Sequence, residues 1–397
     1  MLINMDTAVT GWLTAETARA RLGCARQTLY AYVSRGLVQA RPLPDDPRRS
    51  LYDPHGIEAL VARRHRGRAR QAIAASTIDF GEPVLTSRIT CIADGALWYR
   101  GQDARRLAAT ASLEDVAALL WDAPGFPPLP ASTYGPGPAG TAIARCLSHM
   151  ARLSAGPGLW ARGPEALLID AAVALRAVAE AACDAAVDRP VHEALAAAWG
   201  VDAAGAGLLR RALVLCADHE LNASAFAVRV VASTGAALPN CLMAGLAALS
   251  GPLHGGMTER VRAMLAEPGM FSDPAAAVAA RLARGEVLPG FGHPLYPTGD
   301  PRAADLLAAL DPGPGWRRML ATVAALTGSQ PNIDAALFAL EQRLGLPAGS
   351  ALAVFAIGRT AGWIAHALEQ HQAGHLIRPR AVYAGPVPAK GGAFAGP

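Results

Sequence analysis

The chain has 397 residues, of which 52% are hydrophobic and 17% are charged, and its formal net charge is +4. This length allows two or three domains, and so apolar a composition predicts helices that are buried on more than one side. The absence of a run of about 18 uncharged apolar residues, and of a signal-peptide pattern at the start, argues against a membrane-bound or secreted protein. The six cysteines are scattered without a CxxC pair, which favours reduced thiols and a cytoplasmic location.

Positive charge is concentrated at the N-terminus. Residues 1–70 contain 12 arginines against 6 acidic residues, so the rest of the chain carries a net charge of −2. Such an asymmetry indicates a module that faces a polyanion, followed by a region with a different task.

The elements predicted for residues 1–70 fit a small DNA-binding domain. GWLTAETARARLG predicts a helix that Thr14 caps and Gly23 ends, and CARQTLYAYVSRG predicts a second helix after a short turn. A Pro-rich hairpin and a third helix follow. Two short helices joined by a turn are typical of a helix-turn-helix, and the whole pattern resembles winged, MerR-like modules.

In such a module the start of the second helix would face the major groove of DNA. The residues expected there are Arg26, Gln27, Thr28 and Tyr30. Arg48, Arg49 and the arginines of 63–70 would meet phosphates. The alternative is a small protein-contact domain with a solvated basic face. Ala25 stands where a serine or threonine would cap the second helix better.

After a linker at 71–84, the sequence predicts an all-α body. A short hairpin is expected around Asp94-Gly95. Ala/Leu-rich segments with helical spacing follow it to the end of the chain. The predicted helices are 105–121, 140–154, 164–186, 189–200, 203–217, 222–234, 239–249, 258–266, 274–284, 301–310, 315–327, 332–344 and 350–371.

Three loops of the body contain side chains that are suited to catalysis. GPLHGG holds His254, LPGFGHPLYPTGDPRA holds His293 and Arg302, and QPNIDAALFAL places Asp334 at a helix start. Histidines on Gly-rich loops can donate hydrogen bonds to carbonyl oxygens, and a carboxylate removed from water can act as a base toward a carbon acid. Arginines bind carboxylates in a bidentate manner. Together these groups suit the enolisation of one carbonyl compound and its addition to another that bears carboxylates.

Residues 85–385 resemble the citrate synthase family, which includes the 2-methylcitrate synthases. The motifs DHELNASAFAVRVVAST, GPLHGG, GFGHPLYPTGDPRA, PNIDAALF, GRTAGWIAHALEQ and LIRPRAVYAG occur in the family's order. The resemblance implies a large helical domain (85–257 and 361–397) and a smaller one (258–360) that closes over the substrate. It also implies a homodimer, and acyl-CoA and oxaloacetate as substrates with no separate cofactor.

The resemblance also implies a role for each matching residue. Asp334 would remove the methyl proton of acetyl-CoA, and His254 would hydrogen-bond the thioester oxygen. His293 would polarise the oxaloacetate ketone. His219, Arg302 and Arg378 would contact oxaloacetate, and the citryl-CoA product would be hydrolysed in the same site. A zinc site at His366, His371 and His375 is not expected, because their spacing is poor for that metal.

Two of the chain's departures from the family pattern bear on substrate binding. Pro294 and Pro297 stand where active members usually have arginine and lysine, which predicts fewer cationic contacts to the CoA phosphates. No arginine follows Arg380, although the family's tail often carries one that reaches the partner subunit's substrate. Three functions stay open: a citrate synthase, a 2-methylcitrate synthase that uses propionyl-CoA, and a DNA-binding regulator whose citrate-synthase-like body senses metabolites.

Overall fold

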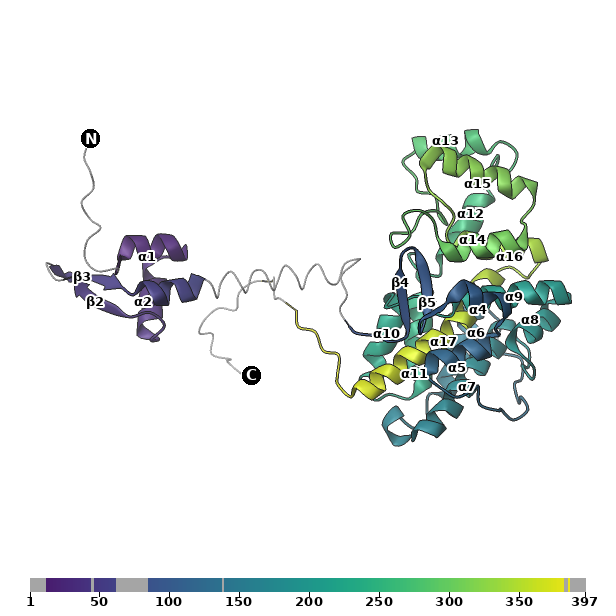
Figure 1. Cartoon of the computed structure of the whole chain (residues 1–397), viewed down its shortest axis with the longest axis horizontal. Helices are drawn as coiled ribbons and strands as arrows, with labels where there is room; N and C mark the ends of the chain where they lie inside the picture. Colours follow the sequence, from purple (N-terminus) through teal and green to yellow (C-terminus); the bar gives the residue numbers. More distant parts are fainter. Residues whose placement is uncertain (1–11, 44–45, 62–84, 138, 382–384, 386–397) are drawn as a thin grey trace, which may run out of the picture. The chain divides into compact units, whose positions relative to one another are not determined.

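The computed structural model describes residues 12–43, 46–61, 85–137, 139–381 and 385. The chain divides into two compact units, 1–86 and 87–397, which are drawn in Figure 1 and described separately below. The predicted linker at 71–84, the arginines of 63–70 and most of the tail after Arg380 lie outside the described residues.

The first unit combines short helices with a small antiparallel sheet. Its strand order is β1-β3-β2, and a further helix begins at Pro54. The elements are β1 (Leu13–Thr14), α1 (Ala15–Leu22), α2 (Arg26–Ser34), β2 (Ala40–Leu43) and β3 (Asp46–Tyr52). The two predicted helices and the hairpin are therefore present, whereas the DNA-binding role of this unit remains a prediction.

Local sequence explains where these two helices begin and end. The Thr14 hydroxyl accepts a hydrogen bond from Thr17 N, and Gly23 ends α1 in the left-handed conformation at φ 58°. Ala25 gives α2 no side-chain cap. A small core holds the unit together, formed by Ala18, Leu22, Leu29, Val38, Tyr52 and Ile57.

The second unit begins with a hairpin and continues as helices, as the sequence predicts. Asp94 and Gly95 turn between β4 (Thr90–Ala93) and β5 (Ala96–Tyr99) with positive φ, and β6 (Gln102–Asp103) completes the sheet. The helices are α4 (Ala104–Thr110), α5 (Leu113–Trp121), α6 (Ala142–Leu153), α7 (Pro164–Cys183), α8 (Val191–Trp199), α9 (Ala203–Cys216), α10 (Ala223–Ala232), α11 (Leu238–Leu249), α12 (Met257–Leu265), α13 (Pro274–Ala283), α14 (Pro301–Leu310), α15 (Pro314–Thr327), α16 (Ile333–Leu344) and α17 (Ser350–Ala373), with a 3₁₀ turn at Leu159–Ala161.

One predicted helix is divided in the structure. The sequence predicts a single helix over 105–121, but α4 ends at Thr110 and α5 begins at Leu113. Ser112 and Asp115 form a capping box, in which each side chain bonds the other residue's backbone N–H. A box of this kind satisfies the free N–H groups of a helix start and so stabilises a break here.

Helix α17 is the centre of the second unit. It contacts α5, α6, α7, α9, α10, α11, α12 and α16. Its length and apolar composition would suit a membrane span, but 94% of its apolar window is buried inside the unit. Gly358 and Gly362 let the end of α9 approach closely: a Cβ at Gly362 would lie 2.4 Å from Ala217 O, and a Cβ at Gly358 would lie 2.6 Å from Leu213 O.

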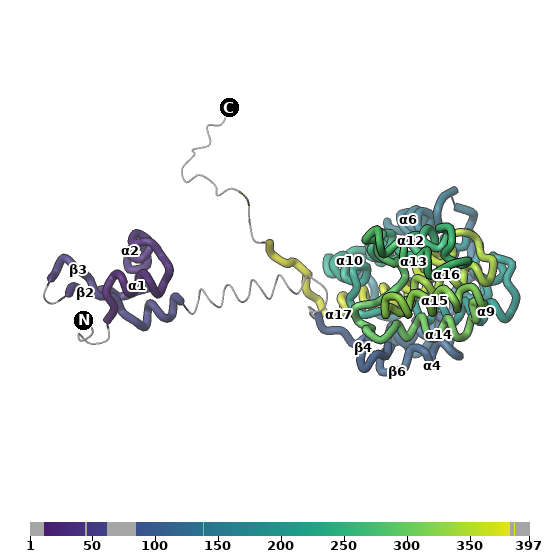
Figure 2. The backbone as a smooth tube through the Cα atoms, turned by 90° about the horizontal axis from the view of Figure 1, so that it is seen from above, coloured from purple at the N-terminus to yellow at the C-terminus, as the bar shows by residue number. Residues whose placement is uncertain are grey.

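Helices α12 to α16 form a group within this unit. Figure 1 shows them gathered above the remaining helices, and Figure 2 shows them from above. They contact the rest through α9, α17 and α4. The predicted division into a large domain (85–257 and 361–397) and a small domain (258–360) remains a prediction, as does closure between them.

Candidate active site

Asp300 joins the loop before α14 to the start of α16. Its carboxylate accepts hydrogen bonds from the backbone N–H of Arg302 at 3.0 Å and of Ile333 at 3.0 Å. The same loop is tied to α16 a second time, because Asn332 N donates to Gly290 O at 2.8 Å. These bonds fix Asp334, the second residue of α16, beside the loop that carries His293.

Asp334 is a half-buried residue with one enclosed carboxylate oxygen. Its Oδ1 is fully enclosed and accepts no hydrogen bond from the described residues. Burial raises the pKa of Asp334 to about 7, although Arg302 and Arg359 oppose the rise. A carboxyl that titrates near neutral pH can both take and release a proton, as a general base must.

Three aromatic rings lie together in the same unit. The ring centroids of His219 and His293 are 5.1 Å apart, and the Tyr296 ring lies 5.6 Å from the first and 5.1 Å from the second. His219 Nε2 is 3.0 Å from the Tyr296 hydroxyl. His293 Nδ1 accepts the backbone N–H of Leu295 at 3.2 Å, so the proton of a neutral His293 ring lies on Nε2.

The site histidines are neutral at physiological pH. Burial lowers the pKa of His293 to about 4, with Arg302 adding to the shift. Burial, and then Arg359, lower the pKa of His254 to about 4. The pKa of His219 is also lowered well below its usual value, first by burial and then by Arg302. A neutral imidazole donates one hydrogen bond without bringing a charge into the site.

His254 lies in a tight turn before α12. A Cβ at Gly256 would meet Ser250 O at 2.7 Å, and one at Gly255 would meet the Leu249 side chain at 2.6 Å. The two glycines therefore allow the loop to fold against the end of α11. His254 Nε2 is 2.7 Å from the Ser224 hydroxyl on α10. This hydroxyl donates to Asn222 Oδ1 at 2.7 Å and accepts the Trp363 indole N–H at 3.1 Å.

Arg302 is a buried cation beside His293 and Asp334. Its side chain is 3% exposed and forms a bidentate pair with Asp300, at 3.0 Å from Nε and 2.8 Å from Nη2. Burial opposes its charge, but the Asp300 carboxylate outweighs burial and raises the pKa of Arg302 above its usual value. The pair uses Nε and Nη2, which leaves Nη1 for a further anion.

Arg359 is a second buried cation to which the sequence argument assigned no role. It lies on α17, is 1% exposed, and donates from Nε to Cys216 O at 2.9 Å. Its Nη2 has no hydrogen-bond partner among the described residues. Burial lowers the pKa of Arg359, and its charge acts on His254, His219 and Asp334. An arginine within the otherwise apolar GRTAGWIAH is the signal that would have identified it.

Arg378 is not part of this cluster within the chain. It follows α17, is exposed, and makes no hydrogen bond or ion pair with the described residues. His366, on the same helix, instead pairs with Asp218 at 3.3 Å in full burial. The part of the chain that the structure describes contains no group of three metal-ligating side chains.

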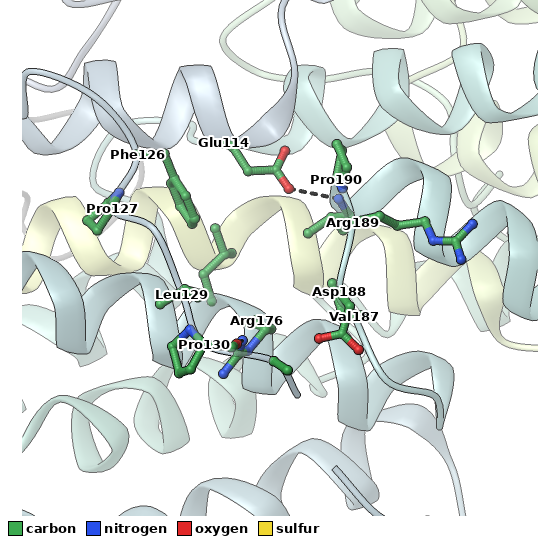
Figure 3. A pocket seen from close by; sticks show the side chains of 13 residues that line it. Glu114, Phe126, Pro127, Leu129, Pro130, Arg176, Val187, Asp188, Arg189 and Pro190 are labelled. Atoms are coloured by element: carbon green, nitrogen blue, oxygen red, sulfur yellow. Dashed lines mark hydrogen bonds between the residues drawn. The ribbon is translucent and has the colours of Figure 1, made fainter. Parts of the chain in front are cut away.

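A separate cavity of about 420 Å³ lies beside α5 and α7. Figure 3 shows Glu114 and Phe126 on one side and Arg176 and Asp188 on the other. None of the predicted site residues lines it. The candidate active site is therefore a different part of the unit, where the loop that carries His293 meets the start of α16.

The residues predicted to face DNA lie on the first unit. Arg26, Gln27, Thr28 and Tyr30 are all exposed on α2. The Arg26 Nε donates to the Tyr30 hydroxyl at 2.9 Å, and the guanidinium lies 5.5 Å from the ring centroid. Arg48 and Arg49 on β3 are exposed as well.

The sequence is similar to that of known enzymes. A family model described as "Citrate synthase, C-terminal domain" matches residues 161–380. Citrate synthase 2 of Bacillus subtilis is 39% identical over 186 residues, which cover 44% of this chain and 50% of that protein. The 2-methylcitrate synthase of Mycobacterium tuberculosis is 37% identical over 188 residues, with 44% and 47% covered. The chain thus spans about half the length of the curated relatives it matches.

Solved structures match more of the chain. The citrate synthase of Thermotoga maritima is 27% identical with a TM-score of 0.61, and the match covers 78% of this chain and 96% of that one. The citrate synthase of Thermoplasma acidophilum has a TM-score of 0.61 at 23% identity, covering 79% and 97%, which shows a common fold.

Proposed function

This chain belongs to the citrate synthase family, and we propose that it condenses an acyl-CoA thioester with oxaloacetate. With acetyl-CoA the products are citrate and CoA. The observation that carries the proposal is the Asp334 carboxyl, which has an enclosed, unpaired Oδ1 and a pKa of about 7 that suits a base. It lies among neutral histidines and two buried arginines, the equipment for deprotonating a carbon acid and holding an anionic acceptor.

In the first step Asp334 takes a proton from the carbon next to the thioester carbonyl. His254 donates a hydrogen bond to the thioester oxygen, where negative charge develops as the enolate forms. This role requires a proton on Nδ1 and a bare Nε2, so the Ser224 hydroxyl would have to turn its proton from Asn222 Oδ1 to His254 Nε2, each of which lies 2.7 Å away. When the proton has moved to Asp334, the carbon next to the thioester carbonyl is a nucleophile.

In the second step the new nucleophile attacks the ketone carbon of oxaloacetate. A carbon–carbon bond forms, and the carbonyl π pair moves to oxygen. His293 carries its proton on Nε2 because Leu295 N–H occupies Nδ1, so it can donate to that oxygen and yield the alcohol. Water then cleaves the resulting acyl-CoA and releases the tricarboxylate and CoA.

The acceptor's carboxylates require cations. Arg302 offers Nη1, and Arg359 offers the unpaired Nη2, so we propose that these two hold oxaloacetate. Arg378 lies on the surface after α17. We propose that it contributes to oxaloacetate binding only through a homodimer, in which it would reach the partner's site.

The identity of the acyl donor is the finer question. The relatives include both citrate synthases and 2-methylcitrate synthases at similar identity. Acetyl and propionyl groups differ by one methylene, worth about 1–3 kcal/mol in an apolar pocket. We propose acetyl-CoA as the donor and 2-methylcitrate synthesis from propionyl-CoA as the alternative.

The decisive experiment is a thiol-release assay with oxaloacetate and either acetyl-CoA or propionyl-CoA. We expect CoA release by the wild-type chain, and the ratio of kcat/KM for the two donors identifies the substrate. The Asp334→Ala variant is the control and should lose most of the rate. Absence of release with both donors, in folded protein, would overturn the enzymatic function.

We propose DNA binding as a second function, located in the first unit. The exposed Arg26, Gln27 and Thr28 begin α2, and no side chain caps that helix, so its first N–H groups remain open to a phosphate. The test is a gel shift with DNA upstream of the coding region at about 0.15 M salt, repeated without residues 1–70. A shift that survives this deletion contradicts the assignment.

A regulator without catalysis is the remaining alternative. In that case the second unit would bind oxaloacetate, citrate or acyl-CoA and change the affinity of the first unit for DNA. The two assays separate these functions: a regulator shifts DNA in a metabolite-dependent way and releases no CoA. Release of CoA together with a DNA shift assigns both functions to one chain.

A further inference from the structure

Residues 293–299 form two successive turns that share Tyr296. Tyr296 N donates to His293 O at 2.9 Å, and Gly299 N donates to Tyr296 O at 3.0 Å. Each turn has a proline as its second residue, Pro294 in the first and Pro297 in the second. Proline is favoured at this position because its ring presets φ near −65°. The two prolines therefore hold the backbone of Tyr296 from both sides.

The Tyr296 side chain is buried among charged and titratable groups. It is 2% exposed, and its ring lies against His219 and His293. The Arg302 guanidinium is 5.8 Å from the ring centroid. Burial raises the pKa of the Tyr296 phenol above its usual value, so the group is an O–H donor and not a phenolate.

The phenol proton has one acceptor among the described residues. The hydroxyl lies 3.0 Å from His219 Nε2, and it makes no other hydrogen bond in the described part of the chain. If His219 donated from Nε2, the buried phenol proton would lose its partner, which costs more than a satisfied bond gains. Donation from the phenol to the ring satisfies both groups.

We propose that Tyr296 donates its O–H to His219 Nε2 and thereby keeps the proton of that ring on Nδ1. Tyr296 is then a positioning residue, which determines which side of His219 carries a donor. Two buried cations, Arg302 and Arg359, act on His219 and disfavour a second proton on the ring. The His219 ring therefore stays neutral and carries a single proton, on one of its two nitrogens.

The consequence for catalysis rests on the proposed function. His219 Nδ1–H makes no hydrogen bond with the described residues, so it is available to an oxygen of oxaloacetate. His293 offers Nε2–H beside it. The dipeptides Pro294-Leu295 and Tyr296-Pro297 thus supply one hydrogen bond to each histidine, through Leu295 N–H and the Tyr296 hydroxyl, and leave each ring with a donor for the substrate.

The test combines spectroscopy with kinetics on Tyr296→Phe. With ¹⁵N-histidine in the full-length protein at pH 7, long-range ¹H–¹⁵N spectra distinguish a protonated from a bare ring nitrogen; a His219→Asn spectrum assigns the signals. We expect wild-type His219 to be protonated on Nδ1 and the variant to shift protons toward Nε2. In the thiol-release assay, KM for oxaloacetate should rise about five- to tenfold while kcat changes less.

Tyr134→Phe is the matched control. Its phenol donates to Asp184 Oδ1 at 2.9 Å, and its ring lies edge-on to His149 at 5.3 Å, so it loses the same kind of bond without touching a histidine nitrogen. Neither the spectrum of His219 nor KM should change. His293 serves as an internal reference in both spectra.

The proposal is overturned if the wild-type His219 ring carries its proton on Nε2 or on both nitrogens. It is also overturned if the proton stays on Nδ1 in Tyr296→Phe. If the variant does not fold, the wild-type spectrum decides alone: a proton on Nδ1 supports the proposal and one on Nε2 contradicts it. If the wild type releases no CoA with either donor, the proposed function fails, and the spectra still decide the tautomer.

Discussion

The two units of this chain differ in how far their candidate functional side chains are exposed to water. The first unit exposes Arg26 and Tyr30 on a short helix, where water screens their charge. The second unit buries Arg302 and Arg359 to 2% and 1% exposure, and it encloses one carboxylate oxygen of the half-buried Asp334. Burial changes the protonation of a side chain: it raises the pKa of Asp334 to about 7, and it lowers the pKa of His254 to about 4, so that this histidine is neutral at physiological pH.

The largest effect should follow from removing the enclosed base. Asp334→Asn keeps the shape of the side chain but cannot take a proton, so CoA release should fall about 10²–10⁴-fold. The measurement is kcat in the thiol-release assay. A loss below tenfold would show that another group is the base.

The stability of this variant is its control, and its direction follows from the pKa. Asp334 titrates at about 7 when folded and near 3.9 when unfolded, so the ionised carboxyl lowers the free energy of unfolding increasingly as the pH rises from about 4 to 7. The amide removes that penalty. The Tm of Asp334→Asn at pH 8 should equal or exceed that of the wild type.

The next effect compares a buried arginine with an exposed one. Arg359→Gln removes an enclosed cation with an unpaired Nη2, so KM for oxaloacetate should rise about 10–100-fold, as expected for a lost charged hydrogen bond. Arg378→Gln tests the surface position. If KM rises more in Arg378→Gln, the buried arginine is not the principal carboxylate ligand.

The pH dependence separates the carboxyl from the histidines. Below about pH 7 Asp334 takes up a proton and stops acting as a base, so kcat/KM should fall about tenfold for each pH unit. The histidines add nothing until about pH 4, where His254 and His293 take up protons. The measurement is a profile of kcat/KM from pH 5 to 9. A profile in which kcat/KM stays flat from pH 7 down to pH 5 would contradict the raised pKa of Asp334.

The smallest effect belongs to the exposed surface. Arg26→Ala should weaken specific DNA binding by about 1–3 kcal/mol if the side chain reads a base edge, and it should leave CoA release unchanged. The measurement is a titrated gel shift beside the thiol assay. Equal weakening on unrelated DNA would assign Arg26 to a phosphate instead of a base.

Much of the fold follows from local patterns. Ala/Leu spacing predicted nearly every helix of the second unit, and Asp94-Gly95 predicted the hairpin turn. The single predicted helix over 105–121 failed because the Ser112–Asp115 capping box outweighs the continuous apolar spacing. Periodicity detects a buried face, whereas a break in a helix depends on a few hydrogen bonds at one position.

The site was predictable in part. Gly-rich surroundings indicated His254 and His293, and the family motifs indicated Asp334, whose roles are tested by the experiments above. Arg359 was missed because its one signal, a cation within the apolar GRTAGWIAH, does not show which side chains it meets in the fold. The sequence did not indicate Tyr296 either. Pro294 and Pro297 were interpreted as departures from the family pattern, whereas in the structure they are the second residues of two successive turns.

The sequence by itself determined the family, the helices and the residue types that a condensation needs. Only the tertiary structure decided which of those residues meet and in which protonation state. Helix α17 holds Arg359 against Cys216 O, where its charge acts on His219 and His254, and Asp300 ties the loop of His293 to the start of α16. The physical reason is that pKa values and tautomers depend on burial and on partners distant in sequence, such as Tyr296 and His219, which local patterns do not encode.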